Sequence, residues 1–463
     1  MRILIVIFLI FASISFSQDS LFKEKDLVKY LFDFHPELQQ YKLMLEQAQS
    51  NVLKNRGAFD PKIYSNFNNK SFNDKEYYSI LNGGLNIPVY YGFDINANFD
   101  LNNGDFLNPQ NSLPNNGLYA VGVNLPILQG LFYDARRANL NSAKNFSNIL
   151  EAQQIININD LFFQALNSFW DWVEAYNILL IKEYGLKLTE ERFINTRDAF
   201  LFGDKPAVDT LESYIQLNDR IMQVQQARID EFSARLQLNN FIWNNQNSPI
   251  ILSNISAVNY SNENIFINNI IDTNSIDYNS IPEISILNSN QKENEIQRRL
   301  KLEKLKPKLD LKYNFISENI GQETINNFNT DNYTWGLKFE MPVLLREARG
   351  DLQLADIKIE QTNLKLSQKL FEIENKLKSN FIEFSLLSNQ VDVINRIAID
   401  YELLLEAEKT KFFNGESSIF LVNSRELKLI EYRIKQIEVK KKTILTYYKY
   451  LKNQGILVDY LNQ

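Results

Sequence analysis

The side chains that most often carry out catalysis or bind metals are scarce in this sequence. It contains no cysteine and a single histidine, His35. Disulfides, thiolate metal sites, a cysteine nucleophile and a cysteine lipid anchor are therefore excluded, and we expect no histidine metal centre. Neighbouring carboxylates such as Glu190 and Glu191 could form an acid–base pair, but we interpret them as solvated charges on a helix. The sequence predicts no enzyme, no metal and no cofactor.

The composition favours long regular elements. Of the 463 residues, 49 are basic and 56 acidic, a net charge of −7, so a nucleic-acid partner has no electrostatic support. Only 15 glycines and 11 prolines are present, few for a chain of many short strands and turns. The 44% hydrophobic content argues against a disordered chain.

Residues 1–17 have the pattern of a secretory signal peptide. Arg2 is followed by a nearly continuous apolar run, and the small residues Ser15 and Ser17 precede a cleavage point before Gln18. The apolar run is short for a bilayer span, so a retained anchor is the less favoured alternative. We expect the mature chain to leave the cytoplasm.

Four landmarks occur twice in the same order, which indicates a duplicated domain. They are Pro36-Glu37 and Pro282-Glu283, Pro61 and Pro307, the Pro-containing runs at 125–128 and 341–344, and the glycine motifs at 200–204 and 412–416. We therefore assign 18–246 to a first repeat, 247–281 to an Asn/Ser-rich linker, 282–456 to a second repeat and 457–463 to a tail.

Each repeat contains strands followed by a long helical hairpin. We predict the strands at about 61–127 and 307–343, and the hairpins at about 131–246 and 346–453. In the strand segments every second residue is apolar, for example from Leu309 to Phe315 and from Leu85 to Leu101, so each strand has one apolar and one polar face. This fits either an antiparallel sheet on a core or a barrel wall with lipid outside and water inside.

The helical segments are longer than those of ordinary globular domains. No glycine or proline interrupts 351–414, and apolar residues from Leu366 to Leu405 recur at heptad spacing. Gly203 and Gly415 mark the turns of the two hairpins, because glycine accepts the positive φ of a helix end. Apolar residues off the main seam, such as Trp172, imply further helical neighbours.

Two copies of this unit behind a signal peptide resemble the outer membrane efflux proteins, the TolC family. The resemblance covers about 21–456 and includes the duplicated motifs above. It implies a mainly α protein with a membrane β-barrel: a homotrimer in which each chain gives four strands to a twelve-stranded barrel and two hairpins to a periplasmic tunnel. The strand-like sequence at 85–117 exceeds that need, and we interpret it as longer strands or an extracellular extension.

The resemblance also implies a function. The protein would be the outer membrane channel of a tripartite efflux or type I secretion system in a Gram-negative bacterium, passively conducting substrates and not lipidated. Its partners would be a periplasmic adaptor, an inner-membrane RND or ABC-type transporter and outer membrane lipid. The alternative is a periplasmic coiled-coil adaptor or structural protein without a pore.

In this family the hairpin turns form the periplasmic entrance and the adaptor-docking surface. The residues in that place here are Phe202, Gly203, Asp204, Phe413, Asn414, Gly415 and Glu416.

Acidic residues near these turns could form a gate that favours cations: Asp204, Asp209 and Glu416. Family members often have an Asp six residues after each turn glycine, which Asp209 matches. The second repeat has Leu421 and then Ser424 instead, and Ser417 where some members have a basic partner. The alternative interpretation of the three acids is favourable charge at helix N-termini.

Overall fold

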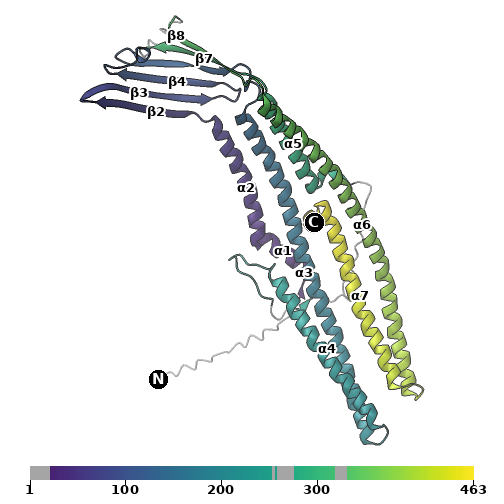
Figure 1. Ribbon diagram of the computed structural model, residues 1–463. Helices are drawn as coiled ribbons and strands as arrows, with labels where there is room; N and C mark the ends of the chain where they lie inside the picture. The colour runs from purple at the N-terminus through teal and green to yellow at the C-terminus, as the bar shows by residue number, and fades with distance from the viewer. Residues whose placement is uncertain (1–20, 253–255, 258–275, 319–330, 463) are drawn as a thin grey trace, which may run out of the picture. The chain divides into compact units, whose positions relative to one another are not determined.

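The computed structural model describes residues 21–252, 256–257, 276–318 and 331–462. The predicted signal peptide and much of the predicted linker lie outside these residues. The chain forms two compact units, and each draws on both halves of the sequence. The sheet unit comprises Tyr41–Ile155 and Asp277–Glu372, and the hairpin unit comprises Met1–Gln40, Ile156–Ile276 and Ile373–Gln463 (Figure 1).

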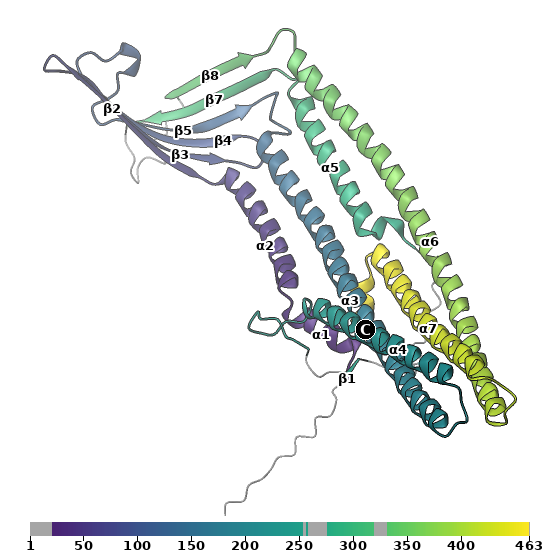
Figure 2. The same ribbon diagram turned by 60° about the horizontal axis from the view of Figure 1, so that its bottom comes forward.

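The sheet unit is built on six antiparallel strands in the order β2-β3-β4-β5-β7-β8 (Figure 2). The strands are β2 (Lys62–Phe72), β3 (Lys75–Pro88), β4 (Asp94–Asn103), β5 (Leu118–Pro126), β7 (Lys308–Ser317) and β8 (Tyr333–Glu340). The first half of the sequence supplies four of them and the second half two, so our expectation of four strands in the chain is wrong.

The excess strand sequence belongs to the same sheet, and β2 and β3, at its edge, form an additional strand pair. A turn divides Leu85–Leu101, where the Val89 amide donates to the Phe93 carbonyl at 2.9 Å. Gly92 adopts a φ of 95° in this turn. A Cβ there would lie 2.7 Å from a guanidinium nitrogen of Arg137, so glycine fits both the backbone and the space.

The register separates the two faces of the sheet as predicted. Apolar residues oppose one another across the strands, as in Ile95 with Val123 and Leu311 with Leu337. On the other face the Asn82 amide donates to Asp100 Oδ1 at 2.8 Å. Amide and hydroxyl groups therefore line one face, while the apolar face is open to solvent in the single chain.

Long helices occupy the predicted segments, and three of them, α2, α3 and α6, belong to both units. The helices are α1 (Glu24–Phe34), α2 (Pro36–Arg56), α3 (Ala135–Leu201), α4 (Ala207–Asn239), α5 (Pro282–Glu303), α6 (Arg346–Phe413), α7 (Ile419–Gln454) and α8 (Leu457–Leu461), with 3-10 turns at Gly57–Phe59, Pro109–Asn111 and Tyr278–Ser280. In the described parts of the chain, no helix combines the length and the apolar character needed to cross a membrane.

The hairpin unit has a core along its helical seams. Ile373, Leu377 and Leu405 of the predicted heptad seam are buried. On α3, Phe169 and Trp172 are fully buried and lie 6.2 and 6.3 Å from the ring of Phe22. These aromatic residues of α3 therefore pack against β1, and Trp172 also donates to Glu231 Oε1 on α4 at 2.9 Å.

The ends of the predicted linker and the predicted tail are structured. Ser256 and Ala257 form strand β6, which pairs in parallel with Leu21 and Phe22 of β1. The tail contains α8, whose Leu457 is fully buried. Both segments contribute to the core of the hairpin unit.

Candidate functional site at the hairpin turns

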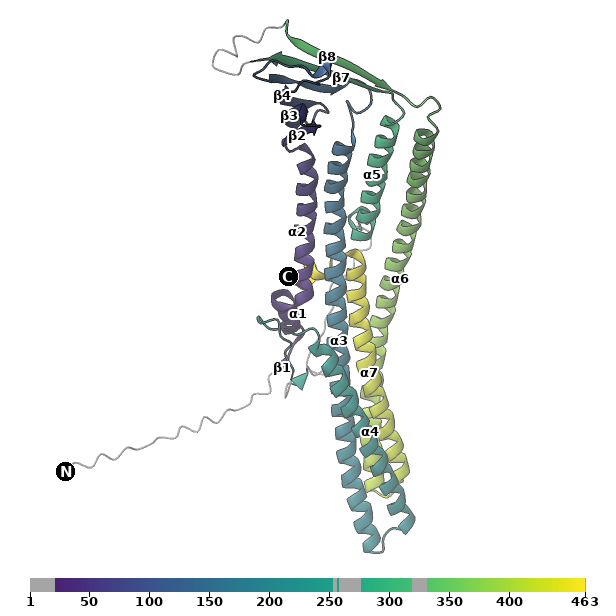
Figure 3. The ribbon, with the colours of Figure 1, turned by 60° about the vertical axis from the view of Figure 1, so that its left-hand side comes forward.

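The two hairpins of the hairpin unit turn through the same backbone motif (Figure 3). After α3, the Gly203 amide donates to Phe200 O at 3.0 Å and the Asp204 amide to Ala199 O at 2.9 Å. After α6, Gly415 and Glu416 repeat these bonds at 3.1 and 2.9 Å. The two glycines have φ of 83° and 78°. Each helix therefore ends in a Schellman motif, which satisfies its last carbonyls and reverses the chain.

Each turn presents an aromatic side chain to solvent. Phe202 is 83% exposed and Phe413 is 86% exposed. Asn414 and the acids Asp204 and Glu416 are exposed as well. Exposed phenylalanines at the end of a hairpin are suited to bind a partner protein, because their burial would be favourable.

The three predicted gate acids have different surroundings. Asp209, in the first turn of α4, lies 3.9 Å from Lys205 Nζ, while Asp204 and Glu416 have no ion-pair partner within the described residues. Lys205 Nζ also lies 5.6 Å from the centre of the Phe412 ring on the other hairpin. Sequence reasoning missed Lys205, although its place two residues after Gly203 was a usable signal.

The second hairpin lacks the corresponding acid and uses other contacts. Leu421 lies where an acid was sought, and its amide donates to Ser418 Oγ at 3.4 Å as part of a helix N-cap. Ser417 donates to Glu408 Oε1 on α6, and Glu408 is itself buried. Ser417 therefore binds an acid of its own hairpin, in the position where a basic partner was expected.

A buried polar cluster connects the two hairpins farther from the turns. Arg192 on α3 donates to Asn423 and to Glu426, both on α7. Asn423 in turn donates to Gln216 Oε1 on α4 at 2.8 Å. Glu426 is only 2% exposed. We call Arg192, Gln216, Asn423 and Glu426 the inter-hairpin cluster, and its charged hydrogen bonds tie three helices together.

Arg220 lies beside this cluster, and the cost of burying its charge is offset by fewer hydrogen bonds than for Arg192. It is 7% exposed and donates to Gln223 Oε1 on its own helix at 3.0 Å. Burial lowers its pKa, an effect opposed by the charge of Glu426. The inter-hairpin cluster and Arg220 together place two arginines near one carboxylate, an arrangement that sequence patterns did not suggest.

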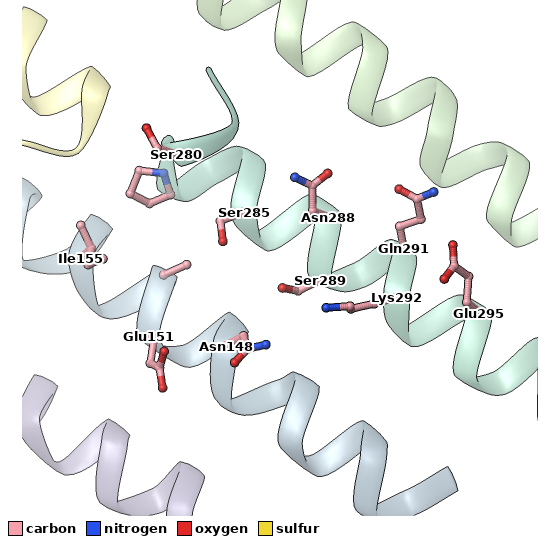
Figure 4. Close-up of a pocket in the computed structure, with 12 residues that line it drawn as sticks. Asn148, Glu151, Ile155, Ser280, Ser285, Asn288, Ser289, Gln291, Lys292 and Glu295 are labelled. Atoms are coloured by element: carbon pink, nitrogen blue, oxygen red, sulfur yellow. The ribbon is translucent and has the colours of Figure 1, made fainter. Parts of the chain in front are cut away.

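Nothing in the described part of the chain is arranged for metal binding: it holds no group of three His, Asp or Glu residues suited to an ion. In the sheet unit, a cavity of about 610 Å³ lies between α3 and α5 (Figure 4). Ser285, Asn288 and Gln291 line it together with Glu151 and Lys292. Its mixed polar lining fits water and carries no arrangement typical of a catalytic site.

Known proteins match this chain by structure and not by sequence. No protein-family model and no curated protein matches it. CusC, which forms a transmembrane channel, shares 12% identity, with 93% of this chain and 92% of CusC covered and a TM-score of 0.66. The CmeC outer membrane channel of Campylobacter jejuni shares 12% sequence identity, and the match covers 93% of this chain and 85% of CmeC with a TM-score of 0.63. The outer membrane protein VceC of Vibrio cholerae shares 10% sequence identity, and the match covers 93% of this chain and 96% of VceC with a TM-score of 0.64.

These matches establish the class of fold. This chain, with its long helical hairpins and antiparallel sheet, shares its fold with these outer membrane channels. The predicted resemblance to the TolC-like channels is therefore confirmed for the fold.

Proposed function

We propose that this chain is the subunit of an outer membrane channel that passively conducts substrates in a tripartite efflux or type I secretion system. The observation that carries the proposal is the sheet with one polar and one apolar face, attached to long helical hairpins in the fold of known channels. An apolar face turned to lipid and a polar face turned to water form a pore wall. We place this wall in the outer membrane and the hairpins in the periplasm.

The open edges of the sheet support association of several copies, which we propose is a homotrimer. Among the described residues, β2 and β8 each lack a partner strand on one side. Unpaired backbone groups are not tolerated in lipid, so the sheet must close into a barrel with other copies. A twelve-stranded barrel would need four strands from each subunit, and this sheet has six.

The exposed phenylalanines of the turns support a docking role. We propose that Phe202 and Phe413, with their flanking turn residues, bind a periplasmic adaptor that connects the channel to an inner-membrane RND or ABC-type transporter. The transporter supplies the energy and selects the cargo, while the channel supplies the path. Asp204, Asp209 and Glu416 would line the entrance.

Planar-bilayer recording of the purified chain tests the proposal. We expect extraction only with detergent, a trimeric mass and discrete ion conductance. A freely soluble monomer without conductance would overturn it and favour the periplasmic coiled-coil alternative. Co-purification of an inner-membrane transporter would identify the system to which the channel belongs.

A further inference from the structure

We propose that all six strands of each subunit belong to the wall, so that three copies close an eighteen-stranded cylinder and not a twelve-stranded one. This inference rests on the proposed trimeric channel and adds the partner of each sheet edge: β8 of one copy pairs with β2 of the next. It follows from the additional strand pair, β2 and β3, which exceeds the four strands expected from the sequence.

The hydrogen-bonding register carries the first step. β2 and β3 are paired from Lys62 with Asn86 to Phe72 with Lys75, and β3 and β4 from Ser79 with Asn103 to Pro88 with Asp94. Most of β2 and β3 therefore runs across the same band of the sheet as β4, and only their turn, from Lys70 to Tyr78, extends beyond it. A hairpin that projected beyond the wall would not share this register.

Side chains on the polar face tie the same three strands together. The Tyr64 hydroxyl on β2 donates to Asn98 Oδ1 on β4 at 2.8 Å and passes over Gly84 on β3. A Cβ at Gly84 would lie 2.6 Å from Asn98 Oδ1 and 2.8 Å from the Tyr64 hydroxyl. The glycine therefore makes room for a bond that spans two strands and holds β2 in the sheet.

The turn between β3 and β4 is attached at the end of the sheet where α3 begins. Arg136, in the first turn of α3, lies 2.7 Å from the carboxylate of Asp94, the first residue of β4. Gly92 lies close to the carbonyls of Gly130 and Leu131. At the end of the sheet where α3 begins, β3 and β4 therefore share the level of the other strands.

The apolar face continues to the edge of the additional strands. Ile63 and Phe67 on β2 lie on the same face as Leu85 and Leu81 of β3 and are 86% and 64% exposed. At the opposite edge, Leu337 and Phe339 of β8 are 56% and 64% exposed. Both edge strands thus present an apolar face that lipid would cover, as a wall position requires.

The number of strands sets the width of the pore. With neighbouring strands about 4.8 Å apart and tilted by about 40°, eighteen strands give a backbone radius of about 18 Å and twelve give about 12 Å. An eighteen-stranded wall would therefore leave an exit with roughly twice the cross-section. Such an exit suits cargo of large diameter.

Disulfide crosslinking tests the pairing directly, because the chain has no cysteine of its own. One cysteine replaces Ser65 on the apolar face of β2, and a second replaces Trp335, Leu337 or Phe339 on β8. A disulfide requires Cβ atoms about 4 Å apart, so only adjacent strands are joined. The three β8 positions cover different registers between β2 of one copy and β8 of the next. We expect at least one of the three cysteine pairs to link most subunits into oligomers on oxidation.

Two matched variants separate the outcomes. Asn66→Cys lies on the polar face of β2 and should not link to the same β8 cysteines. Ala97→Cys on β4 lies between β3 and β5 and should link only if β2 and β3 leave the wall. Linked Ala97→Cys subunits, or trimers in which no Ser65→Cys pair links, would overturn the eighteen-stranded wall. The absence of trimers by native mass would instead overturn the proposed function.

Discussion

Charged residues buried between the two hairpins cannot be explained by hydrophobic packing. Arg192 and Glu426 lie on different hairpins, and their side chains are 14% and 3% exposed. Removing such a pair from water costs free energy that only good geometry and further hydrogen bonds offset. Asn423 and Gln216 supply those bonds. At the residue scale, the inter-hairpin cluster therefore fixes how the hairpins of one chain are joined rather than adding much net stability.

Single and double substitutions separate these two roles. We expect Glu426→Ala to destabilise the chain by about 3–5 kcal/mol, because Arg192 keeps its charge without a buried partner. The double variant Arg192→Met with Glu426→Leu should lose much less, because no unpaired charge remains. Thermal unfolding in detergent measures both, and Arg433→Met, which breaks the more exposed pair with Glu402, is the control. Equal losses in the single and double variants would contradict the coupling.

At the scale of elements, the sequence predicted the helices well because 3.5-residue periodicity and the lack of glycine and proline leave little alternative. The faces of the strands were equally clear. The turn at Val89–Phe93 was missed because Ile87 pairs with Ile95, so both odd positions fall on one face. An alternating pattern is then identical for one long strand and for a hairpin. Pro88 and Gly92 were the local signals.

The candidate site was predicted less completely than the fold. The turn glycines were found because their conformation is a local requirement. The pair of Arg192 with Glu426 was not found, because it depends on which helices pack together. Lys205 lies only four residues before Asp209, so that pair was open to prediction from the sequence and was missed. Charges on a long helix are most often solvated, so periodicity alone gave no reason to select Arg192.

The hairpin turns allow a test in which only backbone conformation changes. A Cβ at Gly203 or Gly415 would contact nothing within 4 Å, so a substitution there meets no steric clash. Valine should cost about 1–2 kcal/mol at each position because it resists a positive φ, whereas asparagine tolerates it. We expect Gly203→Val to reduce crosslinking to the adaptor several-fold and Gly203→Asn to retain most of it. Equal crosslinking of the two variants would remove the turn from the docking surface.

For the whole molecule, the single chain leaves apolar surface that a monomer in water would not retain. On α4, Leu211, Ile215, Met222 and Ile229 are each 58–64% exposed and recur at heptad positions. Such a row is the seam of a helix that lacks its partner. In the described part of the chain, the two edge strands of the sheet are also unpaired on their outer sides. Both features are satisfied together if copies of the chain associate around a common axis.

The α4 row can be disrupted without touching the sheet. Ile215→Asp combined with Met222→Asp places two charges in the row, and each would lose its hydration in a helix–helix contact. We expect this variant to lose most of its trimer by native mass in detergent, while each chain keeps its helical content. Gln237→Asp adds an exposed charge on the same helix away from the row and should remain trimeric. If the double variant were as trimeric as this control, the α4 row would face solvent in the assembly, and closure of the sheet edges alone would hold the copies together.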